Sequence, residues 1–515
     1  MVKEKWTKVA EENELKEGIP AQIEIGQEAI LLVRIDGKIH AYGNQCPHYG
    51  APLGDGHLSN QELTCPWHNA RFNMKDGKMI APPALDDIPV YPVKIENNEV
   101  YIGEAEKPEI TMPEGDDERT FLIVGAGAAG NTAAETLRKA GFAGRIILLT
   151  SENDVPYDRP NLSKMYMSGE APASWIPLRN NEFYDRLEIE LMTKKQVISL
   201  NISDNSVDLA DGENISFDKC LLATGGIPKK LNILDSSMDN VFYLRSFEDA
   251  RNITENIDDM SDILVVGAGF IGTEVAASLR ARELNVHLVA PEKFPMEKLF
   301  GKEVGKRIKK LHTENGVTLH MGTTLEKVEG EENVEQVVLS DGTSLKVDMV
   351  IAGLGIEPAV DYLRETDLLE NGAVPVNEHL QTKAENIYAA GDIAAVLDPN
   401  TGDRTRVEHW AVAEREGQHA AKAMLGHVKP YDEVPFFWTR QFGVSIKSVG
   451  SAKEFNKIAY RGDVAEEDFL AGYYQNGQLR AAVTMGRNDE LYAIEKIMKA
   501  RSSISLEQFK KYDLT

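Results

Sequence analysis

Cysteine and positive charge are both scarce in this chain of 515 residues. Its three cysteines, Cys46, Cys65 and Cys220, are too few for a disulfide framework. The formal net charge of −26 at pH 7 argues against nucleic acid and anionic membranes as partners, because phosphate binding depends on Lys and Arg. No uncharged apolar run could span a bilayer, and residues 1–18 lack the apolar core of a secretory signal. These absences predict a soluble, cytoplasmic protein, and the length predicts several domains.

A glycine-rich turn at residues 125–130, GAGAAG, lies between an apolar run and an alanine-rich helical pattern. Such glycines permit a tight turn and let the backbone approach a pyrophosphate at the helix N-terminus. A second apolar run, 145–149, is followed by an acid suited to ribose hydroxyls. The pattern predicts a dinucleotide site formed by Gly125, Ala126, Gly127, Ala129, Gly130 and Glu152.

The same pattern recurs at residues 262–290, so two dinucleotides are expected rather than one. Ala290 closes the second strand of this repeat, and Glu292 follows two residues later. Glu292 would suit the ribose of NAD, whereas Lys293 would suit the 2′-phosphate of NADP, so NADH is preferred and NADPH stays open. The predicted contacts are Gly267, Gly269, Phe270, Ile271, Gly272 and Glu292.

Short β-like runs broken by Gly, Pro and Asn occupy most of residues 1–103 and predict a small all-β domain. This region contains Cys46-Pro-His48 and, after sixteen intervening residues, Cys65-Pro-Trp-His68. Two Cys/His pairs could bind zinc, although zinc pairs usually come as CxxC and HxxxH. The alternative is a Rieske [2Fe–2S] centre, in which two cysteines hold one iron and two histidines the other.

The segments CPHYGAPL (46–53) and CPWHNARF (65–72) resemble the two cluster loops of the Rieske family. The domain is similar to ferredoxins of ring-hydroxylating dioxygenases and to the small subunit of nitrite reductases. The resemblance implies Cys46, His48, Cys65 and His68 as ligands. Respiratory members of the family carry an additional cysteine in each loop, but the matching positions here are Ala51 and Trp67.

Residues 104–118 carry seven acids, one lysine and two prolines, which is typical of a linker. Farther along, FDKCLLATGGIP (217–228) begins with a buried-looking strand in which Cys220 is expected to be a core thiol. Two segments resemble cofactor-contact segments of two-dinucleotide-binding flavoproteins, one with Ala223, Thr224 and Gly225 and the other with Gly391 and Asp392. Gly355, in the segment 351–359, is also predicted to contact a cofactor. Because flavin-contact segments flank the second repeat, the nicotinamide domain is expected to be inserted within the flavin domain.

The segments PYDRPNLSK (156–164), RVEHWAVAEREG (406–417) and PFFWTRQFG (435–443) resemble ferredoxin reductases of bacterial oxygenase systems and apoptosis-inducing factor. With the N-terminal domain, the chain resembles the Rieske-containing apoptosis-inducing-factor-like flavoproteins. The resemblance implies that Lys164 pairs with Glu274 beside flavin N5 and stabilises negative charge as hydride arrives. It also implies contacts from Arg159, Glu408, His409, Trp410 and Trp438.

Two features depart from related enzymes. Arg440 stands where oxygenase reductases tend to carry an acid, which weakens any transfer of partner recognition. Disulfide reductases and NADH peroxidases need a reactive cysteine near the flavin, but residues 161–164 contain none, which excludes that chemistry.

The expected fold is therefore multidomain: an all-β Rieske domain, an α/β flavoprotein with two Rossmann-like units, and a small α+β C-terminal domain. The expected boundaries are 1–103 for the Rieske domain, 104–118 for the linker, 119–243 and 373–430 for the FAD-binding domain, 244–372 for the NAD(P)H-binding domain, and 431–515 for the C-terminal domain.

The function expected is an oxidoreductase that passes electrons from NAD(P)H through FAD to its own [2Fe–2S] cluster. An unidentified one-electron acceptor, such as an oxygenase, a cytochrome or a small molecule, would follow. A slowly turning redox sensor of the apoptosis-inducing-factor type is the alternative, and flow in the reverse direction stays open. A homodimer is also possible.

Overall fold

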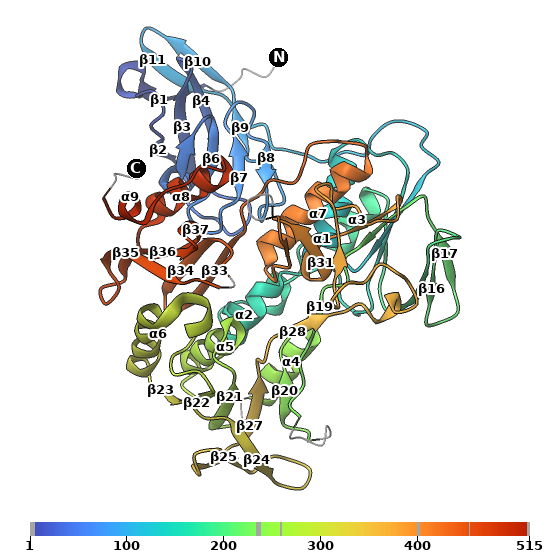
Figure 1. Ribbon diagram of the computed structural model, residues 1–515. Helices are drawn as coiled ribbons and strands as arrows, with labels where there is room; N and C mark the ends of the chain where they lie inside the picture. The colour runs from blue at the N-terminus through green and yellow to red at the C-terminus, as the bar shows by residue number, and fades with distance from the viewer. Residues whose placement is uncertain (1–5, 233–237, 258–259, 399–401, 453, 512–515) are drawn as a thin grey trace. The chain divides into compact units, whose positions relative to one another are not determined.

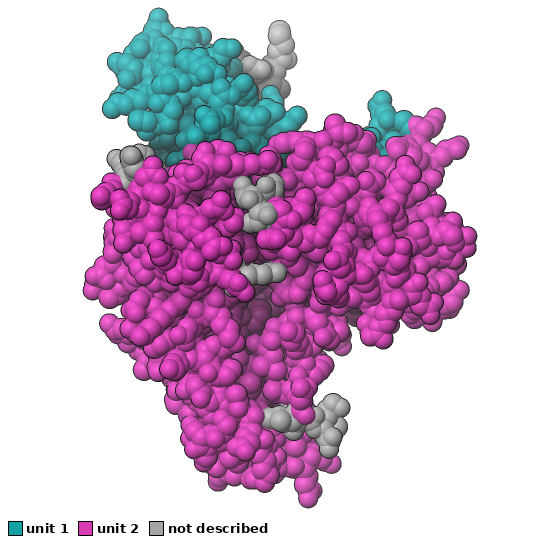
Figure 2. All heavy atoms as spheres, viewed as in Figure 1, with its two compact units in different colours: residues 1–115, 135–143 teal, residues 116–134, 144–515 magenta. Residues whose placement is uncertain are grey.

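The computed structural model describes residues 6–232, 238–257, 260–398, 402–452 and 454–511. The chain divides into two compact units, one of residues 1–115 and 135–143 and the other of residues 116–134 and 144–515 (Figure 2). The outermost residues of the first and last expected domains lie outside the described residues.

Residues 7–102 of the first unit form three antiparallel sheets, which confirms the all-β prediction for the N-terminal domain. One sheet has the order β2 (Ala21–Ile25), β3 (Glu28–Ile35), β4 (Lys38–Gly43), β9 (Val90–Tyr91). Another has the order β1 (Thr7–Glu11), β11 (Glu99–Ile102), β10 (Val93–Glu96). The third has the order β5 (His57–Ser59), β6 (Glu62–Thr64), β7 (Arg71–Asn73), β8 (Met79–Ala81). Two of the loops between these strands, 44–56 and 65–70, carry the Cys/His pairs.

The first residues of the expected linker are hydrogen-bonded to the N-terminal domain. Glu106 exchanges two backbone hydrogen bonds with Val90 of β9, with N···O distances of 2.7 and 3.1 Å. Its acidic composition hides this pairing, because backbone hydrogen bonding at a strand edge does not depend on side-chain hydrophobicity.

The second unit contains two five-stranded parallel sheets of similar construction (Figure 1). The first has the order β14 (Ile189–Met192), β13 (Arg145–Leu149), β12 (Thr120–Val124), β18 (Lys219–Leu222), β30 (Ile387–Ala389). The second has the order β20 (Val241–Tyr243), β27 (Met349–Ala352), β21 (Asp262–Val266), β22 (Asn285–Ala290), β23 (Val317–Met321). Strand β30 returns to the first sheet after the whole second sheet has formed. Strand β20, expected in the flavin domain, instead pairs with β27, so the boundary expected at residue 243 is too late.

Each repeat contains, besides its parallel sheet, a small antiparallel sheet. Short strands and helices make up the rest of this part of the second unit. The small sheets are β15 (Val197–Asn201), β16 (Ser206–Leu209), β17 (Asn214–Ser216) and β24 (Leu325–Glu329), β25 (Gln336–Leu339), β26 (Ser344–Lys346). The short strands are β19 (Gly226–Pro228), β28 (Ile356–Pro358), β29 (Val374–Pro375), β31 (Ala394–Leu397) and β32 (Arg404–Thr405). The helices are α1 (Ala128–Lys139), α2 (Met165–Ser168), α3 (Asn181–Arg186), α4 (Phe247–Asn256), α5 (Phe270–Ala281), α6 (Glu297–Glu314) and α7 (Trp410–Met424).

The C-terminal region confirms the expected small α+β domain. Its antiparallel sheet has the order β33 (Phe436–Gln441), β34 (Val444–Gly450), β37 (Gln478–Met485), β36 (Asp468–Gln475), β35 (Lys457–Asp463). Helices α8 (Asn488–Lys499) and α9 (Leu506–Lys511) follow. Phe300 and Ile308 of α6 share an apolar cluster with Phe469 and Tyr473 of β36, which joins this sheet to the second repeat. No helix in the described ranges is long and apolar enough to cross a membrane.

Candidate functional site

The two glycine turns have the same geometry. Gly125 and Gly267 have φ angles of +105° and +107°, in the region that favours glycine. A Cβ on Gly125 would lie 2.2 Å from the carbonyl oxygen of Ala223, and one on Gly267 would lie 2.4 Å from that of Gly353. In both glycine-turn repeats of the second unit, therefore, the turn packs against the backbone of a neighbouring segment and leaves no room for a side chain.

The remaining glycines of each turn divide into packed and open positions. A Cβ on Gly130 or Gly272 would lie 1.8 or 1.9 Å from the carbonyl oxygen of the first glycine of its own turn. By contrast, a Cβ on Gly127 or Gly269 would meet nothing within 4 Å. The middle glycine of each turn thus presents bare backbone to open space at a helix N-terminus, which fits a dinucleotide pyrophosphate.

A cavity of about 1060 Å³ lies in the second unit, between the carboxyl ends of the parallel strands and the C-terminal sheet. Most of the cofactor contacts predicted from the sequence line it. The exceptions are Gly130, Gly267, Gly272 and Glu292. The three glycines are packed against backbone, so they shape the turns without facing the cavity.

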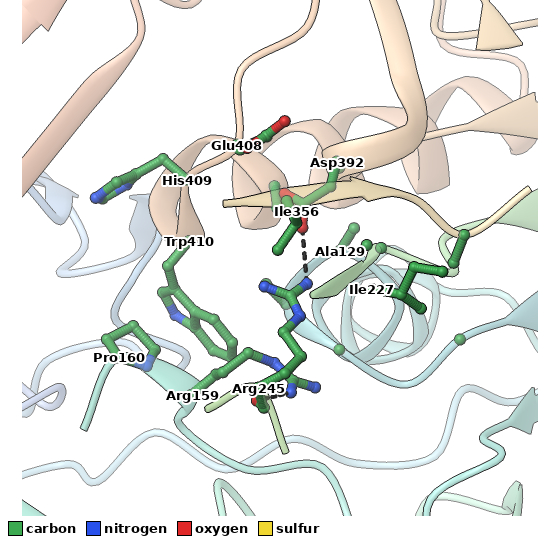
Figure 3. Close-up of a pocket in the computed structure, with 18 of the residues that line it drawn as sticks. Ala129, Arg159, Pro160, Ile227, Arg245, Ile356, Asp392, Glu408, His409 and Trp410 are labelled. Atoms are coloured by element: carbon green, nitrogen blue, oxygen red, sulfur yellow. Dashed lines mark hydrogen bonds and ion pairs between the residues drawn. The ribbon is translucent and has the colours of Figure 1, made fainter. Parts of the chain in front are cut away.

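Glu152 is held in place at one end of this cavity. Its carboxylate accepts a hydrogen bond of 2.6 Å from the Tyr157 hydroxyl and pairs with Arg159 at 3.0 Å. Burial raises the pKa of Tyr157, so its hydroxyl stays protonated and donates. Figure 3 shows the Arg159 side chain beside that of Arg245. The arrangement fixes a carboxylate that is able to accept hydrogen bonds from ribose hydroxyls.

Asp392 is paired with Arg245, a residue that the sequence pattern did not single out. The two side chains lie 2.8 Å apart, and both line the cavity (Figure 3). The backbone N–H of the adjacent residue, Gly391, donates to Glu416 of α7 at 2.7 Å. Burial raises the pKa of Glu416 to about 8. Nothing in the local sequence of Arg245 or Glu416 would have revealed these contacts, since their partners are distant in the chain.

Lys164 and Glu274 meet at the cavity wall, as the resemblance implied. The Lys164 ammonium lies 2.7 Å from Glu274 Oε2, and Glu274 is 3% exposed. The hydroxyls of Ser163 and Thr439 also donate to this carboxylate, at 2.5 and 2.7 Å. Three donors to one buried carboxylate hold it in a single orientation, with the ammonium beside the cavity.

His409 and Trp410 bring two buried donors to the same cavity. The backbone N–H of Trp438 donates to His409 Nε2 at 3.3 Å, so the imidazole proton is on Nδ1. Burial lowers the pKa of His409 to about 3, which keeps the ring neutral. His409 Nδ1 and Trp410 Nε1 are buried and have no partner within the described structure. Buried donors are normally satisfied, so a bound group with acceptor atoms, such as an isoalloxazine ring, fits here.

Glu292, which follows the second strand of the second repeat, does not line the cavity. Its carboxylate pairs with Lys298 at 2.6 Å, and the Lys298 side chain is 80% exposed. The acid expected to contact a ribose is therefore paired with an exposed lysine. Lys298 is a second lysine, besides Lys293, that could interact with a 2′-phosphate.

The two Cys/His loops of the first unit have the same backbone construction. Cys46 N donates to Ala51 O at 2.9 Å, and Cys65 N donates to Ala70 O at 2.7 Å. The fourth residue after each cysteine, Gly50 or Asn69, has a positive φ and donates back to the carbonyl oxygen of that cysteine. Each loop is thus a closed turn that presents its cysteine and histidine on a fixed frame.

The predicted ligands lie as two like pairs, Cys46 with Cys65 and His48 with His68, and no group of three or more possible metal ligands is found among the described residues. Cys46 and Cys65 are buried, at 2% and 1% exposure, and their hydrogen-bonded thiols raise the pKa of Cys46. Nδ1 of His48 lies 3.1 Å from Nδ1 of His68. One pair of thiols and one pair of imidazoles fit the ligand types of a Rieske cluster, in which two cysteines hold one iron and two histidines the other. Cys220, in contrast, is fully buried in β18, as expected of a core thiol.

Comparison with known proteins gives matches over nearly the whole chain. Residues 5–92 match the Rieske [2Fe–2S] domain, residues 119–417 the pyridine nucleotide-disulphide oxidoreductase family, and residues 436–514 the reductase C-terminal domain. Apoptosis-inducing factor 3 from Homo sapiens is 34% identical over 95% of this chain and 83% of its own length.

The reductase part alone matches smaller proteins. Putidaredoxin reductase from Pseudomonas putida is 32% identical over 74% of this chain and 92% of its own. The crystal structure of a covalent putidaredoxin reductase–putidaredoxin complex aligns with a TM-score of 0.73 at 31% identity, covering 77% of this chain and 96% of that one.

Fold and site together define a two-dinucleotide flavoprotein reductase joined to a Rieske domain. The chain belongs to the family of Rieske-containing, apoptosis-inducing-factor-like pyridine nucleotide oxidoreductases. It is an NAD(P)H-dependent oxidoreductase of the ferredoxin reductase type, with FAD and a [2Fe–2S] cluster as cofactors. The match to the Rieske domain decides against the zinc alternative.

Proposed function

We propose that this protein takes two electrons from NAD(P)H at the cavity of the second unit and delivers single electrons through the Rieske centre to an external acceptor. The observation that carries the proposal is the Lys164–Glu274 pair, placed at the wall of a cavity that two glycine turns share. When bound, FAD accepts hydride from a nicotinamide, and the [2Fe–2S] cluster carries one electron at a time.

The first repeat, which begins with β12, would hold FAD. The backbone of Gly125, Ala126, Gly127 and Ala129 would contact the pyrophosphate, with Gly130 allowing the close helix packing. Glu152 would accept from the adenosine ribose. Arg159, Ala223, Thr224, Gly225, Gly355, Gly391, Asp392, Glu408, His409, Trp410 and Trp438 would complete the site.

The second repeat, which begins with β21, would hold the nicotinamide nucleotide. Gly269, Phe270 and Ile271 line the cavity at the N-terminus of α5, where the pyrophosphate would approach, and Gly267 and Gly272 shape that turn. Glu292 would lie near the adenosine ribose. Glu292, Lys293 and Lys298 together would set the choice between NADH and NADPH.

Lys164 would stabilise the charge that develops on the flavin side of the cavity. An ammonium in a partly desolvated site interacts strongly with nearby negative charge. Glu274 would hold Lys164 in place and compensate its charge before the nucleotide is oxidised. In the first unit, Cys46, Cys65, His48 and His68 would hold the cluster.

The relatives favour a one-electron carrier as the partner. Putidaredoxin reductase forms a covalent complex with putidaredoxin in the solved structure, and several relatives are reductase components of dioxygenase systems. Here the fused Rieske domain would take the carrier's place, and a further acceptor would follow.

An anaerobic NADH titration tests the proposal, with visible absorbance and low-temperature EPR recorded together. Flavin bleaching accompanied by a reduced Rieske signal is the expected result. The variant His48→Ala should lose that signal and reduce cytochrome c more slowly, while its flavin still bleaches. His40→Ala is the control, because His40 lies on β4 outside the two loops.

Two results would contradict the proposed relay. One is a flavin that bleaches while the cluster stays oxidised in the unmodified protein. The other is cytochrome c reduction that is equally fast in the unmodified protein and in His48→Ala. A persistent flavin–nicotinamide charge-transfer band with slow reoxidation would favour the redox sensor instead.

A further inference from the structure

A buried string of polar side chains continues from Glu274 away from the cavity. It runs through Thr439 and Gln441 of β33 and ends at His312 of α6. All three are at most 1% exposed. The string thus connects the C-terminal sheet to two helices of the second repeat, behind the pair formed by Lys164 and Glu274.

The direction of each hydrogen bond follows from what its neighbours can donate. The hydroxyl of Thr273 donates to the carbonyl oxygen of Gly269 at 2.8 Å, and that of Thr439 donates to Glu274 Oε1 at 2.7 Å. Both hydroxyl oxygens are therefore left as acceptors. Gln441 Nε2 lies 2.8 Å from Thr273 Oγ1 and 3.2 Å from Thr439 Oγ1, so the amide nitrogen of Gln441 faces both threonines.

This orientation settles the tautomer of His312. Gln441 Oε1 lies 2.8 Å from His312 Nε2, and a carbonyl oxygen only accepts, so Nε2 carries the proton. His312 Nδ1 is then unprotonated, and it is buried without a hydrogen-bond partner among the described residues. Burial lowers the pKa of His312 to about 4, so the ring is neutral at physiological pH.

One continuous series of donors therefore runs toward Glu274, and Gln441 donates in addition to Thr273. His312 donates to Gln441, Gln441 to Thr439, and Thr439 to the carboxylate, which Lys164 contacts from the cavity side. Aligned hydrogen bonds in a low-dielectric interior reinforce one another and stabilise the negative charge at their end. If the string were broken, Thr439 could rotate its hydroxyl elsewhere, and Glu274 would lose a fixed orientation.

We propose that Gln441 and His312 are positioning residues, which hold the Glu274 carboxylate and through it the Lys164 ammonium at the flavin side of the cavity. This inference rests on the proposed role of Lys164. It goes beyond that role because Gln441 and His312 do not line the cavity, and they act through Thr439 on Glu274, which does.

The test uses holoenzyme variants of similar size. His312→Met and Gln441→Met remove the hydrogen-bonding groups, whereas His312→Gln keeps a donor near Nε2. Lys164→Met reports on the pair itself. The readouts are the flavin midpoint potential by spectroelectrochemistry, the rate of anaerobic flavin reduction by NADH, and the apparent unfolding temperature.

The expected result is a lower flavin potential and reduction about tenfold slower in both Met variants, a change of about 1.4 kcal/mol in the barrier. His312→Gln should stay within about twofold of the unmodified protein, because the donor is rescued. Met variants with a lower unfolding temperature but unchanged potential and rate would overturn the inference and leave the string a structural contact.

The variants also separate this inference from the function beneath it. An unchanged potential and rate in Lys164→Met would overturn the proposed role of the pair and the inference together. A shift in Lys164→Met alone would overturn only the inference. If the Met variants do not fold, Thr439→Val against Thr439→Ser decides, since the valine removes the donor to Glu274 at nearly the same volume and the serine keeps it.

Discussion

The two glycine turns of the second unit make nearly the same local contacts, yet the residues around them differ. Around the first, Glu152 is fixed by Tyr157 and Arg159, and Asp392 is paired with Arg245 at the cavity wall. Around the second, the only acid predicted to contact a nucleotide, Glu292, pairs with an exposed lysine outside that wall.

The difference shows that the motif determines the turn, while distant residues determine how firmly a nucleotide is held. Partly desolvated, hydrogen-bonded charges interact strongly with a ligand, whereas exposed ion pairs contribute little. We infer that the first site retains its dinucleotide as a prosthetic group and that the second binds and releases its dinucleotide in each turnover.

The largest expected effect is common to both turns. Gly130→Ala and Gly272→Ala would each place a Cβ within 2 Å of a carbonyl oxygen, at 1.8 and 1.9 Å in the present structure. We expect each to lower the free energy of unfolding by about 3 kcal/mol or more, since such overpacking cannot relax cheaply. Denaturant unfolding measures this loss. If either alanine were tolerated, the two turns would not be structurally equivalent.

The middle glycines should separate the two sites. Alanine at Gly127 or Gly269 meets no protein atom, so both variants should fold normally. Gly127→Ala should purify with about tenfold less FAD, because a methyl group blocks approach of the pyrophosphate. Gly269→Ala should keep its FAD and show a KM for NADH raised about tenfold. The ratio of flavin to protein absorbance and steady-state kinetics measure these effects, and full FAD content in Gly127→Ala would contradict the assignment.

A pH effect is expected at the first site through Glu416. Its pKa is raised from 4.5 to about 8, so the folded protein holds a proton that the unfolded chain releases across this range. Stability from this group is therefore complete below about pH 4.5 and is lost as the pH rises through 8.

Glu416→Gln removes that dependence and keeps an acceptor for the Gly391 N–H. Its apparent unfolding temperature should exceed that of the unmodified protein by about 2–4 °C at pH 9 and be similar at pH 4, below the ordinary pKa of 4.5. Glu385→Gln, on an exposed segment, is the control. A gain in Glu416→Gln that is equal at both pH values would show that charge is not its cause.

The smallest effects are expected at the ion pair of the second site. Glu292→Gln should change the KM for NADH by at most about fivefold, because the pair with the exposed Lys298 contributes about 1 kcal/mol or less. Lys298→Ala leaves Glu292 uncompensated, so the KM for NADPH should rise more than that for NADH. Steady-state kinetics with the two nucleotides measure both variants. A tenfold loss of NADH affinity in Glu292→Gln would show that this acid bonds the ribose directly and would weaken the contrast between the two turns.

Several features could be predicted from the sequence because they depend on local spacing. The glycines of each turn are six residues or fewer apart, and strand, turn and helix follow one another directly in the chain. The two Cys/His loops are equally local, since each closes through hydrogen bonds between residues four and five apart. Steric limits on a few consecutive residues suffice to specify such turns.

Other features depended on how separately built parts pack together. Strand β20 joined the second sheet instead of the first, which no local signal at residues 241–243 indicates. Arg245 reaches Asp392 across 147 residues of chain, and Thr439 reaches Glu274 across 165. A periodic pattern reports which face of an element is buried but not which partner it meets.

The sequence by itself thus determined the class of the protein: two dinucleotide turns, a Cys₂His₂ loop pair, and the Lys164 and Glu274 positions by resemblance. The tertiary structure alone decided what surrounds these groups, including the paired arginines, the buried Glu416 and the string from His312 to Glu274. The physical reason is that a turn depends on the steric freedom of adjacent residues, whereas the charge and orientation of a buried side chain depend on neighbours that only packing brings near.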